Sequence, residues 1–186
     1  NQKVSMDNMK LSMLEGTMMM NGSYATSVPD HPEMDFLLNI KDFDIKKTFN
    51  TFNAAEKIAP VGKYCLGKFS SNMVIAGRLD KKMEAELNTF AGGGGISTKN
   101  VMVENFEPLN KVADAIGNPK LKKMQVSDVN LTFKFKDGRI NIDPFDVKIG
   151  ESKATVSGSN GFDQTLKYVM KMEIPTSELG STANTI

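Results

Sequence analysis

Apolar and polar residues alternate at every second position over much of this chain, which is the pattern of β-strands with one apolar face. The polar partners of each stretch point to the other side. The pattern therefore predicts a β-rich fold whose strands share an apolar face. The alternating stretches are residues 9–13, 34–40, 96–98, 129–135, 140–142 and 166–174.

A tight hairpin is predicted at Asp137-Gly138. This dipeptide between two alternating strands favours a type I′ turn, in which both central residues have positive φ. The register of such a hairpin places Phe135 opposite Ile140 on one face. Residues 126–175 as a whole predict a C-terminal antiparallel meander, with four strands after residue 129.

The apolar parity changes from even to odd at the Asp-Pro step of residues 143–144. Because Pro cannot donate to a strand ladder, we expect a bulge or bend at this step. A further turn is expected at residues 151–152, which would place Ile149 opposite Ala154.

Helical spacing of apolar residues interrupts the strands in three places. We expect one helix over residues 45–58, a second over 106–116 and a third, shorter one over 80–90. The expected fold is thus α+β and β-rich: a curved antiparallel sheet, open, taco-like or half-barrel, with two or three short amphipathic helices.

An internal repeat is suggested by the surroundings of the two longer helices. Each unit runs strand, amphipathic helix, strand and a Gly-Arg-apolar step, over approximately residues 34–79 and 96–140. We expect residues 1–186 to form a single module. Because the chain begins at Asn1, without an initiator Met and in what reads as the middle of a strand, we interpret it as part of a longer chain.

Composition narrows the function classes. Lys plus Arg (23) nearly balance Asp plus Glu (22), so a basic surface for nucleic acid is not expected. The single cysteine, Cys65, excludes an internal disulfide. The longest apolar stretches are far shorter than the roughly 20 residues that a membrane-spanning helix needs.

Catalytic and metal chemistry lack their usual parts in this sequence. The one histidine, His31, lies among loop carboxylates, which we interpret as a solvated loop rather than a metal site. A nucleophile pair of His31 and Cys65 is disfavoured as well. Glycines 92–95 precede a strand rather than a helix, unlike those of a phosphate-binding loop. We therefore predict no enzyme activity, no metal and no cofactor.

Four motifs follow one another in the C-terminal half of the chain. They are LNTFAGGGGI at 87–96, VENFEPL at 103–109, FKFKDGR at 133–139 and ATVSGSNGFD at 154–163. In order and spacing they resemble the C-terminal region of the AsmA family of bacterial envelope proteins, over about residues 80–180. One step departs from the family pattern, since the second glycine of the last motif is displaced to Gly161.

The resemblance implies a periplasmic location and a parent chain anchored in the inner membrane through a segment outside these residues. It also implies a role in outer-membrane assembly and in lipid (phospholipid) transport or homeostasis. Family members resemble long open sheets whose apolar interior is proposed to guide acyl chains. The partners it implies are lipid acyl chains and outer-membrane assembly proteins.

Two functions remain open. In the first, part of the apolar face stays open as a lipid groove, because ten or so strands present more apolar face than a few short helices cover. In the second, the face is a closed core and the chain is a structural protein-protein interaction module without lipid binding. The candidate lipid-binding residues are Leu131, Phe133, Phe135, Ile140, Ile142, Val147, Val156, Tyr168 and Met170.

Overall fold

The computed structural model describes residues 2–27, 30–115, 117–126, 128–149, 151–173 and 175. The strands within them are β1 (Lys3–Met13), β2 (Gly16–Ala25), β3 (Glu33–Asp44), β4 (Cys65–Arg78), β5 (Ala91–Glu104), β6 (Lys123–Val126), β7 (Asn130–Lys136), β8 (Arg139–Ile149), β9 (Ser152–Gly161) and β10 (Leu166–Glu173). The α-helices are α1 (Ile45–Thr51), α2 (Asn53–Ile58) and α3 (Glu107–Ala115). Short 3-10 helices are η1 (Pro60–Tyr64), η2 (Leu87–Thr89) and η3 (Pro119–Lys122).

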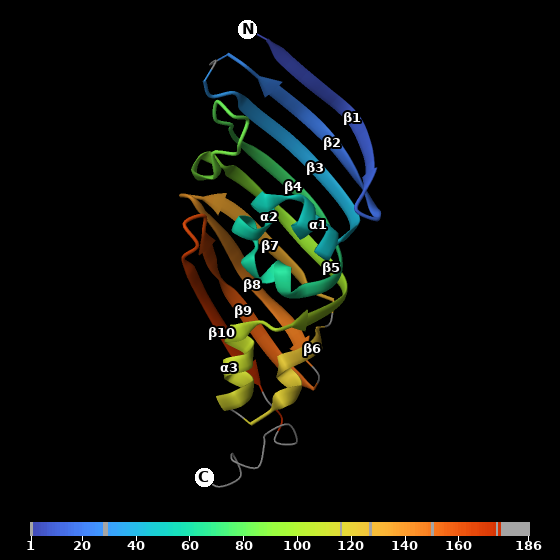
Figure 1. The fold of residues 1–186 in the computed structure, drawn as a ribbon, viewed down its shortest axis with the longest axis vertical. Helices are drawn as coiled ribbons and strands as arrows, with labels where there is room; N and C mark the ends of the chain where they lie inside the picture. Colours follow the sequence, from blue (N-terminus) through green and yellow to red (C-terminus); the bar gives the residue numbers. More distant parts are fainter. Residues whose placement is uncertain are drawn as a thin grey trace.

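The strands form one antiparallel sheet, which is drawn in Figure 1. They follow one another from β1 to β5, and β8, β9 and β10 complete the other side. Between β5 and β8 lie two short strands, because β6 pairs with residues 101–104 of β5 and β7 with residues 92–97. The predicted β-rich fold, a curved antiparallel sheet with a few short helices, is confirmed.

The hairpin predicted at Asp137-Gly138 joins β7 to β8. Phe135 lies opposite Ile140, as the register required. The backbone angle φ is 54° at Asp137 and 67° at Gly138, which are the positive values of a type I′ turn. The predicted meander of four strands is therefore present as β7, β8, β9 and β10, while Ile174 lies outside the described residues.

The change of parity at residues 143–144 is a bulge in β8, as predicted. The pairing of β8 with β9 shifts between Ile142 and Phe145. Because one extra residue enters β8 there, the even-numbered apolar residues before the bulge and the odd-numbered ones after it share a face.

The turn predicted at residues 151–152 was wrong. Ile149 lies opposite Ser152 rather than Ala154, so the chain reverses closer to Ile149 than expected. A shift of two residues keeps every side chain on its own face. Alternation alone therefore fits both registers equally well, and the tightness of the turn decides between them.

The first predicted helix is present, but it is broken into α1 and α2. Phe52 between them has extended backbone angles, φ −111° and ψ 104°. Asp44 caps α1, since its carboxylate accepts a hydrogen bond of 2.7 Å from the backbone N–H of Lys47. The second predicted helix is α3; Ile116, expected at its end, lies outside the described residues.

The third predicted helix, over residues 80–90, was wrong. This segment is a loop that ends in η2. The Asp80 carboxylate accepts hydrogen bonds from the backbone N–H groups of Lys82 (2.8 Å) and Glu84 (2.9 Å), and Met83 has a φ of 65°. These local bonds replace those that a helix would make, which is the usual competition from Asp side chains.

Glycines 92–95 lie inside β5 rather than before it. A Cβ atom added at Gly94 would lie 2.1 Å from the carbonyl oxygen of Asn72, and one at Gly92 would lie 2.1 Å from that of Val74. Both oxygens belong to β4. The glycine run therefore allows β4 and β5 to approach closely, a backbone role that larger residues exclude.

Candidate lipid-binding face

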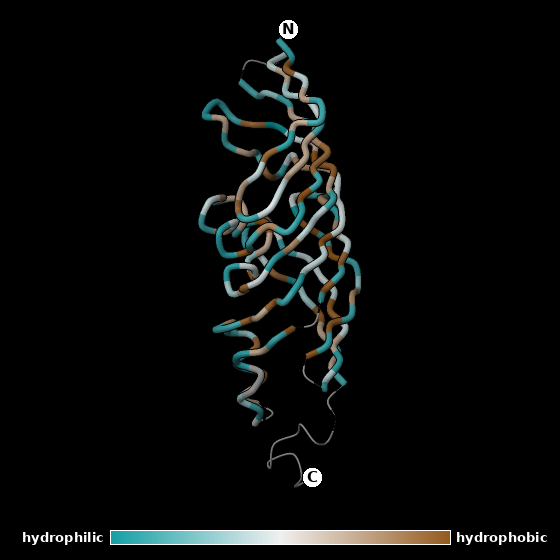
Figure 2. Tube along the Cα trace, turned by 90° about the vertical axis from the view of Figure 1, so that its right-hand side faces the viewer, coloured by the Kyte–Doolittle hydropathy of each residue, from teal (hydrophilic) through white to brown (hydrophobic). Residues whose placement is uncertain are grey.

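One face of the sheet carries α1, α2 and α3 and is called the helical face below (Figures 1 and 2). It is apolar along rows of paired residues that cross the sheet from β1 to β10. One row is Met9, Met20, Leu38, Met73, Gly94, Phe133, Ile142, Gly158 and Tyr168. The next row is Met6, Gly22, Phe36, Ile75, Gly92, Phe135, Ile140, Asn160 and Leu166.

The helices and one loop cover the middle of the helical face. Ile45 of α1 and Leu109 and Ala113 of α3 join one buried cluster, whose sheet residues are Val101, Val103, Val126, Val147, Ile149 and Ala154. Phe90, just after η2, joins a second cluster, whose other buried residues are Ile75, Phe133, Phe135 and Ile140. The rings of Phe90 and Phe135 meet edge to face, with centroids 6.0 Å apart. The middle of the face is thus protein core.

Both margins of the helical face are exposed. At the β10 margin, the exposed fractions are 52% for Leu166, 43% for Tyr168 and 45% for Met170. At the β1 margin, they are 56% for Val4 and 39% for Met9. Met9, Leu166 and Tyr168 lie in the two rows described above, which run through the buried middle of the face, so the apolar surface continues past the cover that the helices supply.

The structure brings the nine predicted lipid-binding residues to this one face, but in three different environments. Phe133, Phe135, Ile140 and Val147 are buried, at 3–9% exposure. Leu131, Ile142 and Val156 are half-buried and pack against the two clusters. Tyr168 and Met170 are exposed. Contact with a ligand is therefore open to the last pair, whereas the buried residues contact other protein side chains.

Asn160 of β9 is a buried polar side chain within these rows, with an exposed fraction of 1%. Its amide nitrogen donates hydrogen bonds to the carbonyl oxygens of Ile58 (2.8 Å) and Lys57 (3.4 Å). Its amide oxygen accepts one of 3.0 Å from the hydroxyl of Tyr168. The Tyr168 ring is exposed along one side, and the partial burial of its hydroxyl raises the pKa of that group. Asn160 therefore joins the end of α2 to β9 and β10.

Sequence reasoning missed Asn160 and the β1 margin. Asn160 could have been found from the alternation along β9, because it has the same parity as Ala154 and Val156 and therefore lies on the apolar side of the strand. The signal for the β1 margin was the alternation over residues 9–13, which the structure extends across a bulge to Val4. Neither signal says whether a helix covers the position.

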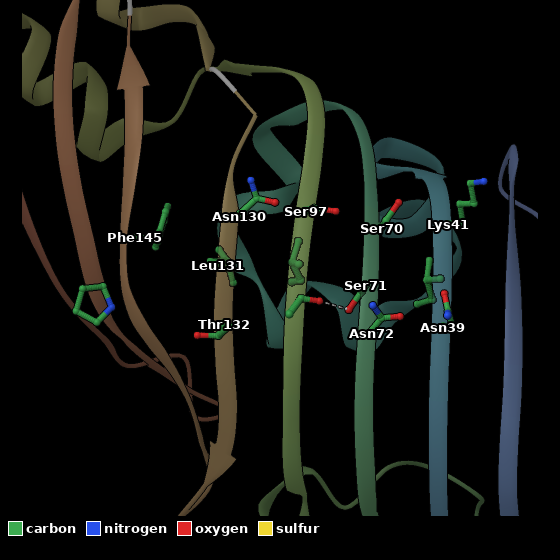
Figure 3. A pocket seen from close by; sticks show the side chains of 14 residues that line it. Asn39, Lys41, Ser70, Ser71, Asn72, Ser97, Asn130, Leu131, Thr132 and Phe145 are labelled. Carbon is green, nitrogen blue, oxygen red and sulfur yellow. Dashed lines mark hydrogen bonds between the residues drawn. The ribbon is translucent and has the colours of Figure 1, made fainter.

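A hollow of about 490 Å³ lies against β3, β4, β5, β7 and β8 near the middle of the sheet (Figure 3). Ser71 in its lining donates a hydrogen bond of 2.9 Å to the carbonyl oxygen of Gly95. Its lining residues are Asn39, Ile40, Lys41, Ser70, Ser71, Asn72, Gly95, Ile96, Ser97, Asn130, Leu131, Thr132, Pro144 and Phe145. These residues offer no carboxylate, histidine or thiol for acid-base or nucleophilic chemistry.

His31 and Cys65 lie at opposite ends of β4. Cys65 begins this strand of 14 residues, and His31 lies beside its far end, where it contacts Glu86 at 3.0 Å. A strand of that length spans about 40 Å at roughly 3.3 Å per residue. Burial raises the pKa of the Cys65 thiol to about 11. The two residues therefore do not form a nucleophile pair.

Among the described residues, no cluster of three or more His, Cys, Asp or Glu side chains is arranged to hold a metal ion. The helices in the same part of the chain are too short and too polar to cross a membrane.

A scan against protein-family models, a search of curated proteins and a search of solved structures each found no match to this chain.

Proposed function

We propose that the chain is a non-catalytic module that handles lipid in the bacterial cell envelope, with acyl chains contacting the two margins of the helical face. The observation that supports this is the exposure of apolar side chains at both margins, from Val4 and Met9 on one strand to Leu166 and Met170 on another. Covering each such side chain contributes roughly 1.5–3 kcal/mol, whether protein or an acyl chain covers it.

This proposal narrows the set of lipid-contacting residues. Tyr168 and Met170 remain in it, and Val4, Met9 and Leu166 join them because of their exposure. The buried residues around Phe133 pack against one another as protein core. A lipid could reach them only after α2 or the loop before β5 moved away.

The location and the biological role are part of the same proposal. The module belongs to the periplasm, on a parent chain anchored in the inner membrane, and serves outer-membrane assembly and phospholipid transport or homeostasis. The AsmA resemblance of residues 80–180 supports this assignment. An open curved sheet with an apolar face that the helices cover only in its middle is compatible with the shape that the family implies.

A structural protein-protein interaction module without lipid binding is the second candidate. The observation that favours it is the burial of Phe133 and Phe135, each at 5% exposure, among other protein side chains. In that case the margins would be covered by protein rather than by lipid. The two candidates differ in what touches Met9 and Leu166 in the envelope.

Mass spectrometry of lipids that co-purify from the native envelope tests the proposal. We expect phospholipid with the unaltered protein and much less with a variant carrying Met9→Asp and Leu166→Asp. The matched control, Ser12→Asp with Asn141→Asp, adds the same charge on the opposite face and should keep the lipid. Phospholipid missing from all three proteins would leave the interaction module as the function.

A further inference from the structure

β10 exposes apolar side chains on both of its faces. Leu166, Tyr168 and Met170 are exposed on the helical face, and Val169 is 58% exposed on the opposite face. One edge of the strand pairs with β9, and no other described strand lies along its second edge. A regular edge strand with apolar residues on both faces is a template for a further strand.

β1, the strand at the other side of the sheet, is not regular in this way. Its pairing with β2 shifts between Met6 and Met9, and Asn8 has a φ of 50°. Such a bulge twists an edge and hinders further pairing. β10 pairs with β9 without any shift from Leu166 to Glu173. β10 is therefore the edge that suits a partner strand.

We propose that β10 pairs antiparallel with β10 of a second copy of this chain, across a twofold axis at Met170. A twofold axis makes the contact self-complementary, so each contact between two different residues occurs twice. In this register Met170 lies opposite the partner's Met170, Tyr168 lies opposite the partner's Met172, and Lys167 lies opposite the partner's Glu173. Residues of one face meet residues of the same face.

Charge favours this register over the neighbouring one, in which the axis lies at Val169. Within the described part of the chain, Lys167 has no carboxylate at ion-pair distance, and the partner's Glu173 would supply one. An axis at Val169 instead would place Lys167 opposite the partner's Lys171, and like charges directly opposite each other are destabilising. Tyr168 and Met170 remain on the apolar side in both registers, so the lysines make the difference.

The pairing would join the helical faces of the two copies on one side of a doubled sheet. The β10 margins would then form the middle of a continuous apolar surface instead of its limit. This inference does not rest on lipid binding, since it concerns the strand edge and the charges beside it.

Cysteine crosslinking with analytical ultracentrifugation of the 186-residue chain tests the pairing. We expect a dimer in sedimentation and a disulfide-linked dimer of Met170→Cys under oxidised glutathione. Val169→Cys is the matched control and should not crosslink, because Val169 lies opposite the partner's Lys171. Circular dichroism checks that each variant keeps the fold of the unaltered protein.

A charge exchange gives an independent readout. Lys167→Glu should raise the Kd of the dimer at least tenfold, and adding Glu173→Lys should recover part of this loss, because Glu173 also lies opposite Lys153 within each copy. A monomer at every concentration, a dimer that crosslinks through Val169→Cys instead of Met170→Cys, or a dimer that crosslinks through neither would each overturn the proposal.

Discussion

The side-chain amide of Asn160 donates a hydrogen bond of 2.8 Å to the backbone carbonyl oxygen of Ile58, which lies 102 positions earlier in the chain. This carbonyl belongs to the last residue of α2, whose final carbonyls have no partner within the helix. Asn160 supplies one. The bond thus holds the helical segment over a sheet strand far away in sequence.

Replacement of Asn160 by Ala should lower the free energy of unfolding by about 1–3 kcal/mol, because it removes the hydrogen-bond partner of the Ile58 carbonyl and of the Tyr168 hydroxyl. Urea unfolding measures the effect. Asn141→Ala, on the exposed face of β8, is the matched control and should change the free energy by less than about 0.5 kcal/mol. Equal effects of the two variants would mean that Asn160 does not anchor α2.

Phe133→Asp should cost at least about 4 kcal/mol of stability, because the carboxylate would be buried without a cation beside it. Met9 lies in the same row of the helical face as Phe133 but at an exposed margin. Met9→Asp should therefore lower the free energy of unfolding by no more than about 1 kcal/mol. Thermal unfolding followed by circular dichroism compares the two. Tolerance of Asp at Phe133 would show that the middle of the face is open.

Gly94→Ala should destabilise the protein by roughly 1–3 kcal/mol, because the added Cβ atom would collide with the backbone of β4. Gly95→Ala is a control one position away, where the nearest atom to an added Cβ is 3.6 Å distant. It should have little effect. Urea midpoints of the two variants decide whether the close approach of β4 and β5 limits the size of this residue.

The Cys65 thiol should react slowly with a disulfide reagent at pH 8. Its pKa in the folded chain is about 11, so little thiolate forms at that pH. Because burial raises the pKa of the Cys65 thiol, the unfolded chain loses this proton at a lower pH than the folded chain does. The contribution of this thiol to the free energy of unfolding is therefore present below about pH 9 and is lost as the pH rises through about 11. Absorbance at 412 nm with Ellman's reagent follows the reaction.

A Ser12→Cys variant in a Cys65→Ser background supplies an exposed thiol for comparison and should react rapidly. In urea the unaltered protein should react as rapidly as this variant. Rapid reaction of Cys65 in the folded chain would contradict its burial.

The sequence predicted the features of the fold that depend on a few neighbouring residues. Asp137-Gly138 determines a hairpin because few other dipeptides favour positive φ twice, and Pro144 marks the bulge because it lacks an N–H. The turn after Ile149 was misplaced because a shift by two residues keeps the same faces. The sequence predicts a helix after Asp80 because Met83, Leu87 and Phe90 recur at helical spacing, whereas the hydrogen bonds of the Asp80 carboxylate that form the loop leave no periodic signal.

The candidate face was predicted better than its cover. Alternation assigned Phe133 and Met170 to one side of the sheet, since parity is a local property of a strand. That Phe133 is buried and Met170 exposed depends on Ile58 and Phe90, which arrive from distant segments. The polar anchor Asn160 was hidden for the same reason, because its partners belong to another part of the chain.

Photo-crosslinking in cells tests the central claim, that lipid contacts the margins of the helical face. A photoreactive amino acid is placed at Met9 or at its neighbour Lys10, which is also exposed but points to the opposite face. A second pair, Leu166 and Lys167, repeats the comparison at β10. We predict phospholipid adducts at Met9 and Leu166 and none at the two lysines. Adducts with protein alone at Met9 and Leu166 would contradict a role in lipid handling.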